Sequence, residues 1–342
     1  MKATWTKTRE AEHLRRSSQI AATFNQWLMI LGGELKPREP IGNTIEVVDI
    51  GITSQESNED ILFLALPNAP SPRVGSASTT LKDALYIFSG RGGQAMDALE
   101  ENGSLWALEP GKNPQEIQWS QIPPTSASYP CGRSYHTLTN DGSRFIYLHA
   151  GCSAKGRLSD LWAFDIVRRK WGELAPAPDP PRGGTSIAHL DGLVYRMNGF
   201  DGQKEQGGAI DIYDRDTNSW STERFEADGI HGPEPRSVSA LLPVKIEGRD
   251  WLVTLFGERD PSSLGHQGAG KMLGDVWAWE VYGSEKRWTR VETQGERSLP
   301  RGCFAADVVG KGGKEAVVVH GGLGESNERL GDVWVLEFKG LA

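Results

Sequence analysis

Three side chains that can bind a metal ion or transfer a proton lie within one short stretch of the sequence. Glu258, Asp260 and His266 fall inside the segment LFGERDPSSLGHQGAGKMLGD, which runs from Leu255 to Asp275. Two carboxylates and one imidazole can face a divalent cation such as iron or manganese, or can act as general acids and bases. We therefore predict these three residues as the catalytic group and as a candidate metal site.

An ordinary polar turn is the alternative interpretation of this stretch. A glutamate in a turn is usually solvated, and Asp260-Pro261 is typical of a turn in which the aspartate bonds the backbone. The glycines at positions 265, 268 and 270 would then only allow the loop to fold tightly. Both interpretations stay open on the sequence alone.

The stretch belongs to a unit that recurs six times along the chain. Each unit opens with an arginine and small residues, and continues with two apolar segments, the second of which ends in small residues. A polar loop and a segment of the Asp-Val-Trp type follow, and most units close with a segment that has tryptophan near its start. The opening arginines are Arg16, Arg73, Arg133, Arg182, Arg236 and Arg301. At the position aligned with Glu258 the other units usually have glycine, so this glutamate departs from the repeat.

Composition and repeat predict an all-β chain that closes on itself. The 342 residues include 41 Gly, 19 Pro and 12 Trp, which is typical of short strands joined by tight turns. The last unit has no fourth strand, whereas Ala3–Glu10 resembles the missing segment, so we expect it to pair with Asp332–Phe338 and remove an open edge. One domain is predicted over residues 1–342, with units at about 13–66, 73–122, 132–177, 182–224, 236–294 and 301–338 and a closing strand at 3–10.

The order of these elements resembles the kelch repeat over nearly the whole chain. The resemblance is carried by the opening Arg-Ser-Tyr-His at residues 133–136, by glycine doublets such as Gly321-Gly322, and by Asp-Val-Trp segments such as 332–334. It implies a six-bladed β-propeller with four antiparallel strands in each blade. Kelch propellers usually bind other proteins, so it also implies an interaction scaffold as one role.

Hairpin geometry predicts that the opening arginines and the Glu258 loop share one face of the molecule. The first two strands of a unit form an antiparallel hairpin, so the start of the first lies beside the end of the second. In a propeller the first strand lines the central channel, and the six arginines should therefore surround one of its mouths. Arginine offers a planar fork of donors to anions and carbonyls, so we expect the six to bind substrate. The alternative is that they brace neighbouring backbone and carboxylates.

A second resemblance concerns the loop itself. Glu258, His266 and the His-x-Gly-x-Gly at residues 266–270 look like the loop of plant specifier proteins, kelch propellers that divert glucosinolate breakdown with ferrous iron, and of their fungal kelch relatives. In the specifier motif the aspartate comes four residues after the glutamate, whereas Asp260 comes two residues after Glu258. The resemblance implies a pocket at this loop, Fe2+ held by Glu258, Asp260 and His266, and a lyase, isomerase or cyclase activity in specialised metabolism.

Composition also narrows the partners and the compartment. The net charge is −8 and no basic run occurs, which argues against nucleic acid and anionic membranes as partners. The N-terminus has no apolar run like a signal peptide, and three cysteines do not imply a disulfide framework. We expect a cytoplasmic enzyme with a small-molecule substrate at the channel mouth, or alternatively a kelch scaffold with a protein partner and no catalytic activity. The sequence identifies neither the substrate nor the reaction.

Overall fold

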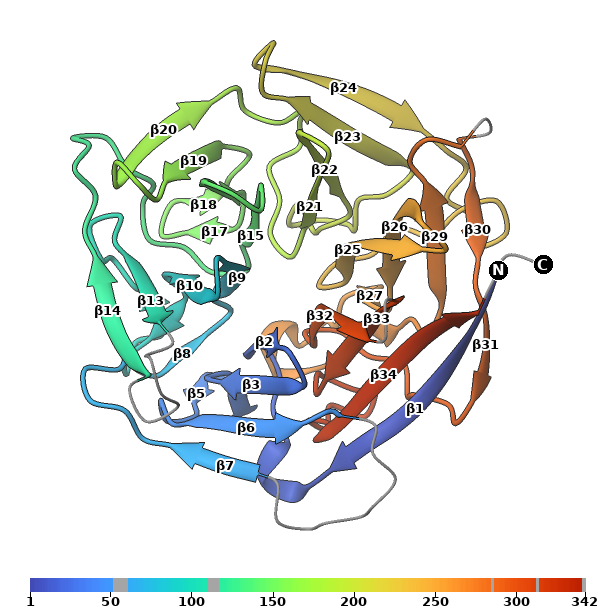
Figure 1. Cartoon of the computed structure of the whole chain (residues 1–342), viewed down its shortest axis with the longest axis horizontal. Helices are drawn as coiled ribbons and strands as arrows, with labels where there is room; N and C mark the ends of the chain where they lie inside the picture. The colour runs from blue at the N-terminus through green and yellow to red at the C-terminus, as the bar shows by residue number, and fades with distance from the viewer. Residues whose placement is uncertain (52–60, 110–116, 284–285, 312–313, 340–342) are drawn as a thin grey trace.

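Antiparallel sheets arranged around a common centre make up the fold. The computed structural model describes residues 1–51, 61–109, 117–283, 286–311 and 314–339. In these ranges the main strands form six sheets of four or five strands each, and their innermost strands contact one another around the centre (Figure 1). This is a β-propeller, which confirms the all-β prediction. Within the described ranges, no helix is long and apolar enough to cross a membrane.

The sheets are numbered here in chain order, and their strands are given from the centre outward. Sheet 1 contains β2 (Ile20–Phe24), β3 (Trp27–Leu31), β6 (Ile45–Asp49) and β7 (Ile61–Leu64). Sheet 2 contains β9 (Ala77–Leu81), β10 (Ala84–Phe88), β13 (Leu105–Glu109) and β14 (Gln118–Ile122). Sheet 3 contains β15 (Thr137–Asn140), β16 (Phe145–His149), β19 (Leu161–Asp165) and β20 (Lys170–Leu174). Sheet 4 contains β21 (Ser186–Leu190), β22 (Leu193–Met197), β23 (Ala209–Asp214) and β24 (Ser219–Arg224). Sheet 5 contains β25 (Ala240–Ile246), β26 (Arg249–Leu255), β29 (Val276–Glu280) and β30 (Trp288–Arg290). Sheet 6 contains β32 (Ala305–Lys311), β33 (Lys314–His320), β34 (Asp332–Lys339), β1 (Lys2–Glu10) and β31 (Glu292–Gly295).

The N-terminal strand β1 lies inside sheet 6. It pairs antiparallel with β34, and Ala3 stands opposite Phe338, as the sequence predicts for this pairing. It is not the outermost strand, however, because β31 pairs with it in parallel on the other side. Trp5 is only 4% exposed and stacks on Phe256 of sheet 5, with ring centroids 5.6 Å apart.

Apolar residues fill the spaces between neighbouring sheets. Tyr86 and Phe88 of sheet 2, for example, pack in one cluster with Ile146 and Leu148 of sheet 3. The second strands are apolar on both sides because a neighbouring sheet covers each face. Each such fully buried side chain contributes roughly 1.5–3 kcal/mol relative to exposure.

Short hairpins extend from the ends of the second strands on one face of the disc. They comprise β4 (Glu34–Lys36) with β5 (Glu39–Pro40), β11 (Arg91–Gly92) with β8 (Arg73–Val74) and β12 (Asp97–Ala98), β17 (Cys152–Ser153) with β18 (Gly156–Arg157), and β27 (Glu258–Arg259) with β28 (Lys271–Met272). Two short 3-10 helices, η1 (Glu12–Leu14) and η3 (Gly265–Gln267), complete the described elements. We call this side of the disc the hairpin face.

A closed ring of backbone hydrogen bonds surrounds the axis at the hairpin face. The residue two positions after each opening arginine donates its N–H to the carbonyl of its counterpart in the preceding sheet, over 2.7 to 3.2 Å. The ring members are Ser18, Gly75, Tyr135, Gly184, Val238 and Cys303, all with φ between 46° and 63°. The bond from Ser18 to Cys303 joins sheet 1 to sheet 6, so the ring has no free end. This ring positions the hairpins around the axis.

Candidate functional site

Glu258 does not stand at a turn-glycine position, which corrects the sequence alignment by one residue. Gly257 has a φ of 113° and donates its N–H to the carbonyl of Arg301, as the last glycine of the other units does to the next opening arginine. The residue before it, Phe256, has a φ of 54°, a left-handed conformation that glycine usually adopts. Phe256-Gly257 is therefore the doublet, and a bulky phenylalanine at its first position, where the other units have Gly, Ser, Ala or Asn, concealed the register.

Glu258 belongs to a set of six equivalent positions around the axis. Each pairs with the residue that directly follows an opening arginine. The other five are Glu34, Arg91, Cys152, Phe200 and Leu323. Two of the charged members have partners outside this set: Glu34 forms an ion pair with Arg329 at 3.1 Å, and Arg91 donates to Ser134.

A pocket of about 130 Å³ lies over the ring, between the hairpins of sheets 3 to 5. We call it the outer pocket. Ring residues form its floor and hairpin residues its walls. Its lining comprises Tyr135, Gly184, Val238, Cys303, Cys152, Arg157, Gly183, Phe200, Ser237 and Glu258. The pocket thus brings together a carboxyl group, a guanidinium group and two thiols from separate parts of the sequence.

Glu258 is the acidic group of the outer pocket. Its Oε1 accepts a hydrogen bond from the backbone N–H of Gly270 at 2.6 Å. Burial raises the pKa of Glu258, and the Gly270 N–H opposes this only in part. A carboxyl group with a raised pKa can hold or release a proton nearer to neutral pH, which suits general acid–base chemistry.

Arg157 is the cationic group of the outer pocket. Its guanidinium carbon lies 5.0 Å from the centroid of the Phe200 ring, a distance typical of cation–π contact. Its Nε atom is buried and has no hydrogen-bond partner among the described residues. A buried donor without a partner is costly, so Arg157 is poised to bind an anionic or carbonyl group of a ligand.

Glu205 and the two cysteines complete the polar surroundings. Glu205 stands opposite Phe200, and burial together with the nearby charges of Glu258 and Asp260 raises its pKa. Burial, aided by the charge of Glu258, raises the pKa of Cys303 to about 12, and burial also raises that of Cys152. Both thiols are therefore protonated at neutral pH and are poor nucleophiles.

Of the predicted trio Glu258, Asp260 and His266, the structure describes the side chains of the first two, and these differ in their surroundings. Asp260 has a φ of 51°, which breaks the strand alternation that would turn it toward Glu258. Its side chain is 69% exposed and accepts a hydrogen bond from Arg259 at 3.0 Å. His266 lies in η3, and its side chain is outside the described part of the chain.

The structure does not test the iron site predicted at this loop, because the side chain of His266 lies outside the described part of the chain. Glu258 lines the outer pocket, whereas the Asp260 carboxylate lies at the surface beside Arg259. Among the described residues, the group of three ligand atoms close enough for one ion is Glu226, Asp228 and His231, all exposed. Iron held by Glu258, Asp260 and His266 stays a prediction from the resemblance, and no chemical step below depends on it.

The opening arginines lie within the sheets and not along the outer pocket. All six are buried, with 0% to 7% exposure. Four make bidentate hydrogen bonds to a carboxylate of the same sheet: Arg73 to Glu101, Arg133 to Asp160, Arg236 to Asp275, and Arg301 to Asp332. Arg16 pairs with Glu46, and Arg182 donates to the carbonyls of Pro180 and Asn198. Most of their donors brace the repeats, the alternative to the substrate-binding role expected for them. The exceptions include Nε and Nη1 of Arg16, which are buried and have no hydrogen-bond partner among the described residues.

Replacing Asp275 with asparagine is expected to destabilise the protein by about 1–3 kcal/mol, because it weakens charged hydrogen bonds in a buried site. Burial alone would raise the pKa of Asp275, but the hydrogen bonds and charge of Arg236 hold it below its ordinary value. A pKa that is lower in the native state than in the unfolded chain stabilises the fold at pH values above the unfolded-state pKa, which is near 4. This stabilisation is lost as the pH falls through the native-state pKa. Urea unfolding between pH 2 and 7 should therefore show the difference between parent and Asp275→Asn shrinking below about pH 4.

Glu280→Gln is the matched control, since Glu280 pairs with the exposed Arg249 at 3.1 Å. This variant should change the free energy of unfolding by less than about 1 kcal/mol. Equal effects of the two substitutions would contradict the bracing role of Arg236.

The sequence interpretation did not identify Arg157, Glu205, Phe200 and Tyr135 as site residues. Arg157 and Glu205 stand opposite Cys152 and Phe200 in their hairpins, so both follow from the set of six positions around the axis. Once Gly257 is aligned with the glycines that end the other doublets, this set could be found in the sequence. Tyr135 would follow in the same way from its place two residues after Arg133.

Comparisons with known proteins agree with the fold and give two kinds of relative. A family model described as the KLHDC2/KLHL20/DRC7 Kelch-repeats domain matches residues 18–253. An enzyme of Thlaspi arvense, named N-(sulfonatooxy)prop-2-enimidothioate sulfolyase, is 26% identical over 93% of this chain and 91% of its own length. An F-box/kelch-repeat protein of Arabidopsis thaliana is 28% identical over 79% of the chain, and host cell factor 2 of Homo sapiens is 24% identical over 70%. The chain spans only 55% and 30% of these last two proteins.

Proposed function

We propose that this chain, which belongs to the kelch-repeat family, is a six-bladed propeller closed by its N-terminal strand. It acts as a small-molecule enzyme at the outer pocket. The observation that carries this proposal is the presence of Glu258 and Arg157 in the lining of one pocket. Glu258 has a raised pKa, and the Nε of Arg157 lacks a partner among the described residues. A proton-transferring group and a guanidinium group with a free buried donor at one cavity suit catalysis better than protein docking.

The substrate class follows from the size and charge of the outer pocket. A volume of about 130 Å³ is slightly below the cavity of about 150 Å³ that holds benzene in another protein. The part of the substrate that enters is therefore compact, and Arg157 selects an anionic group on it. The relative from Thlaspi arvense is named as a lyase of a sulfonatooxy compound, which is consistent with an anionic substrate.

The reaction that these groups support is a lyase, rearrangement or cyclisation step on a reactive anion. Arg157 orients the anionic group and stabilises the charge that grows on it as a bond breaks. Glu258 in its protonated form gives its proton to the departing or newly charged oxygen, and the resulting carboxylate takes a proton back from substrate or water. The protonated thiols of Cys152 and Cys303 contribute shape and not a nucleophile.

Binding of a small anion provides the first test. Titration of the full chain with sulfate, followed by NMR or calorimetry, should show saturable binding that weakens at least tenfold in Arg157→Gln, because the fork of donors is lost. The control is Arg168→Gln, which removes a charge from the same sheet at a side chain that is 74% exposed. Equal binding by parent and Arg157→Gln would refute the pocket as an anion site. In a separate experiment, mass spectrometry of small molecules that co-purify with the parent chain identifies the natural ligand.

A protein-interaction scaffold is the second candidate function, and exposed apolar residues favour it. Ile230 is 76% exposed in the segment between β24 and Arg236, and Tyr129 is partly exposed before Arg133. Two of the relatives, an F-box/kelch-repeat protein and host cell factor 2, are much longer than the part that the chain matches. If no small anion binds the outer pocket, this candidate takes precedence.

A further inference from the structure

We propose that Tyr135 separates the outer pocket from the central channel and so limits the length of the substrate that the pocket accepts. This inference rests on the proposed function, because it concerns the substrate of the same pocket. It is carried by a second cavity directly beneath the ring and by the position of the Tyr135 side chain between the two cavities.

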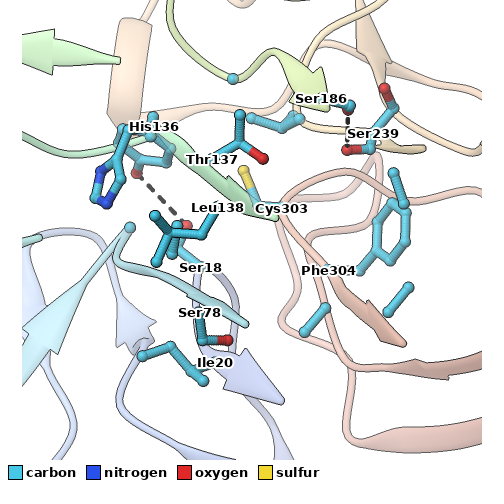
Figure 2. A pocket seen from close by; sticks show the side chains of 18 of the residues that line it. Ser18, Ile20, Ser78, His136, Thr137, Leu138, Ser186, Ser239, Cys303 and Phe304 are labelled. Atoms are coloured by element: carbon cyan, nitrogen blue, oxygen red, sulfur yellow. Dashed lines mark hydrogen bonds between the residues drawn. The ribbon is translucent and has the colours of Figure 1, made fainter. Parts of the chain in front are cut away.

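The second cavity has a volume of about 230 Å³ and lies along the axis. We call it the inner channel. Figure 2 shows Ser18, Thr137, Ser186, Ser239 and Cys303 around it. Its lining mixes such small polar groups with apolar side chains, including those of Ile20, Leu138 and Phe304. It can therefore hold an extended aliphatic or hydroxylated chain.

The ring of backbone hydrogen bonds forms the passage between the two cavities. Tyr135, Gly184, Val238 and Cys303 line both the outer pocket and the inner channel. Hydrogen-bonded neighbours lie roughly 4.8 Å apart, so a ring of six places the backbone about 5 Å from the axis. Since carbon atoms in contact are about 3.5–4.0 Å apart, the backbone leaves space for a single file of atoms. The ring side chains decide whether that space is open.

Tyr135 is the side chain that reaches across this space. A Cβ atom added at Gly75 would lie 3.4 Å from the Cε2 and Cζ atoms of Tyr135, so the phenol ring passes over sheet 2. Its hydroxyl group lies 3.5 Å from the Oγ of Ser18 in sheet 1, the contact that Figure 2 marks from Ser18. Both ring neighbours of Tyr135 are glycines, Gly75 and Gly184, which leave room for the phenol. Tyr135 also lines a third small cavity beside Glu34 and Arg91.

The size of the outer pocket is therefore set by one side chain. Ligand sites usually have volumes of roughly 300–1,000 Å³, well above that of the outer pocket alone. Joining the inner channel to it would bring the combined space into this range. The contact between Tyr135 and Ser18 is long for an O–H···O hydrogen bond, so the bulk of the phenol ring, and not this contact, closes the passage.

The experiment measures chain-length dependence with unbranched carboxylates, from acetate to octanoate, by calorimetry or ligand-observed NMR. In the parent, affinity should stop rising near butanoate, because the growing tail meets Tyr135. In Tyr135→Gly, each further methylene group that leaves water should tighten binding by up to about fourfold, so octanoate should bind at least tenfold more tightly than to the parent. Glycine suits the φ of 51° at this position, so the variant should fold.

Two conservative variants and a second probe make the outcome decisive. Tyr135→Phe and Ser18→Ala keep the aromatic ring and should retain the cut-off of the parent. If octanoate binds the parent as tightly as Tyr135→Gly, the proposal is overturned. If no carboxylate binds any variant, the anion pocket of the proposed function fails, and xenon-pressurised crystals then test Tyr135 alone. Xenon density that becomes continuous through the ring only in Tyr135→Gly supports the proposal, and density that is unchanged by the substitution refutes it.

Discussion

Removal of residues 2–10 is expected to abolish cooperative folding of the protein. The deletion takes β1 out of the middle of sheet 6, exposes one edge of β34 and leaves β31 without a partner. It also removes Trp5, which is buried against Phe256 and Trp334. Loss of one buried tryptophan costs about 3–5 kcal/mol, and native domains are stable by only about 5–15 kcal/mol. Circular dichroism melting curves of the two chains measure the effect.

The control for this deletion is Trp5→Ala, which removes the side chain but keeps the strand. It should lower the melting temperature and preserve a single cooperative transition. Adding a peptide of residues 1–11 to the truncated chain should restore part of the transition, because the peptide can pair with β34. A truncated chain that melts within a few degrees of the parent would show that β1 does not close the structure.

Most of the repeat architecture could be predicted from the sequence because it depends on local patterns. The opening arginines, the apolar segments and the Asp-Val-Trp segments recur in the same order, and each marks a strand or the start of one. Pairing of β1 with β34 followed from a missing strand at one end and a surplus one at the other. The parallel pairing of β31 with β1 could not be foreseen, because Glu292–Gly295 is exposed and polar.

The candidate site was less predictable because it depends on backbone conformation at single residues. Phe256 adopts a left-handed conformation that residue type does not indicate, and the alignment of Glu258 was therefore shifted by one position. A positive φ at Asp260 turned a carboxylate, expected beside Glu258, toward Arg259 instead. Arg157 and Glu258 line one pocket although they are about 100 positions apart in the sequence, and they could be assigned to it only after the register of the Phe256-Gly257 doublet was known.

Glu258→Gln is expected to reduce kcat by about 10²- to 10⁴-fold on the ligand identified by mass spectrometry, since it removes a proton-transferring group. Glutamine retains an oxygen that can accept the Gly270 N–H, so the loop should keep its shape. If Glu258 acts as the acid, kcat/KM in the parent should fall as the pH rises through its raised pKa, and this limb should be absent in the variant. Activity measured across pH, together with urea unfolding of both proteins, separates a chemical effect from a folding effect.

Asp260→Asn distinguishes the outer pocket from the trio inferred from the sequence. If Asp260 works together with Glu258 and His266, this variant should lose activity as severely as Glu258→Gln. The exposed position of its carboxylate beside Arg259 instead leads us to expect activity within about twofold of the parent, because exposed ion pairs contribute little. Arg259→Ala, which removes the other half of that pair, should behave in the same way. A severe loss in Asp260→Asn with unchanged stability would return the catalytic assignment to the trio, whereas full activity in Glu258→Gln would remove Glu258 from the chemistry altogether.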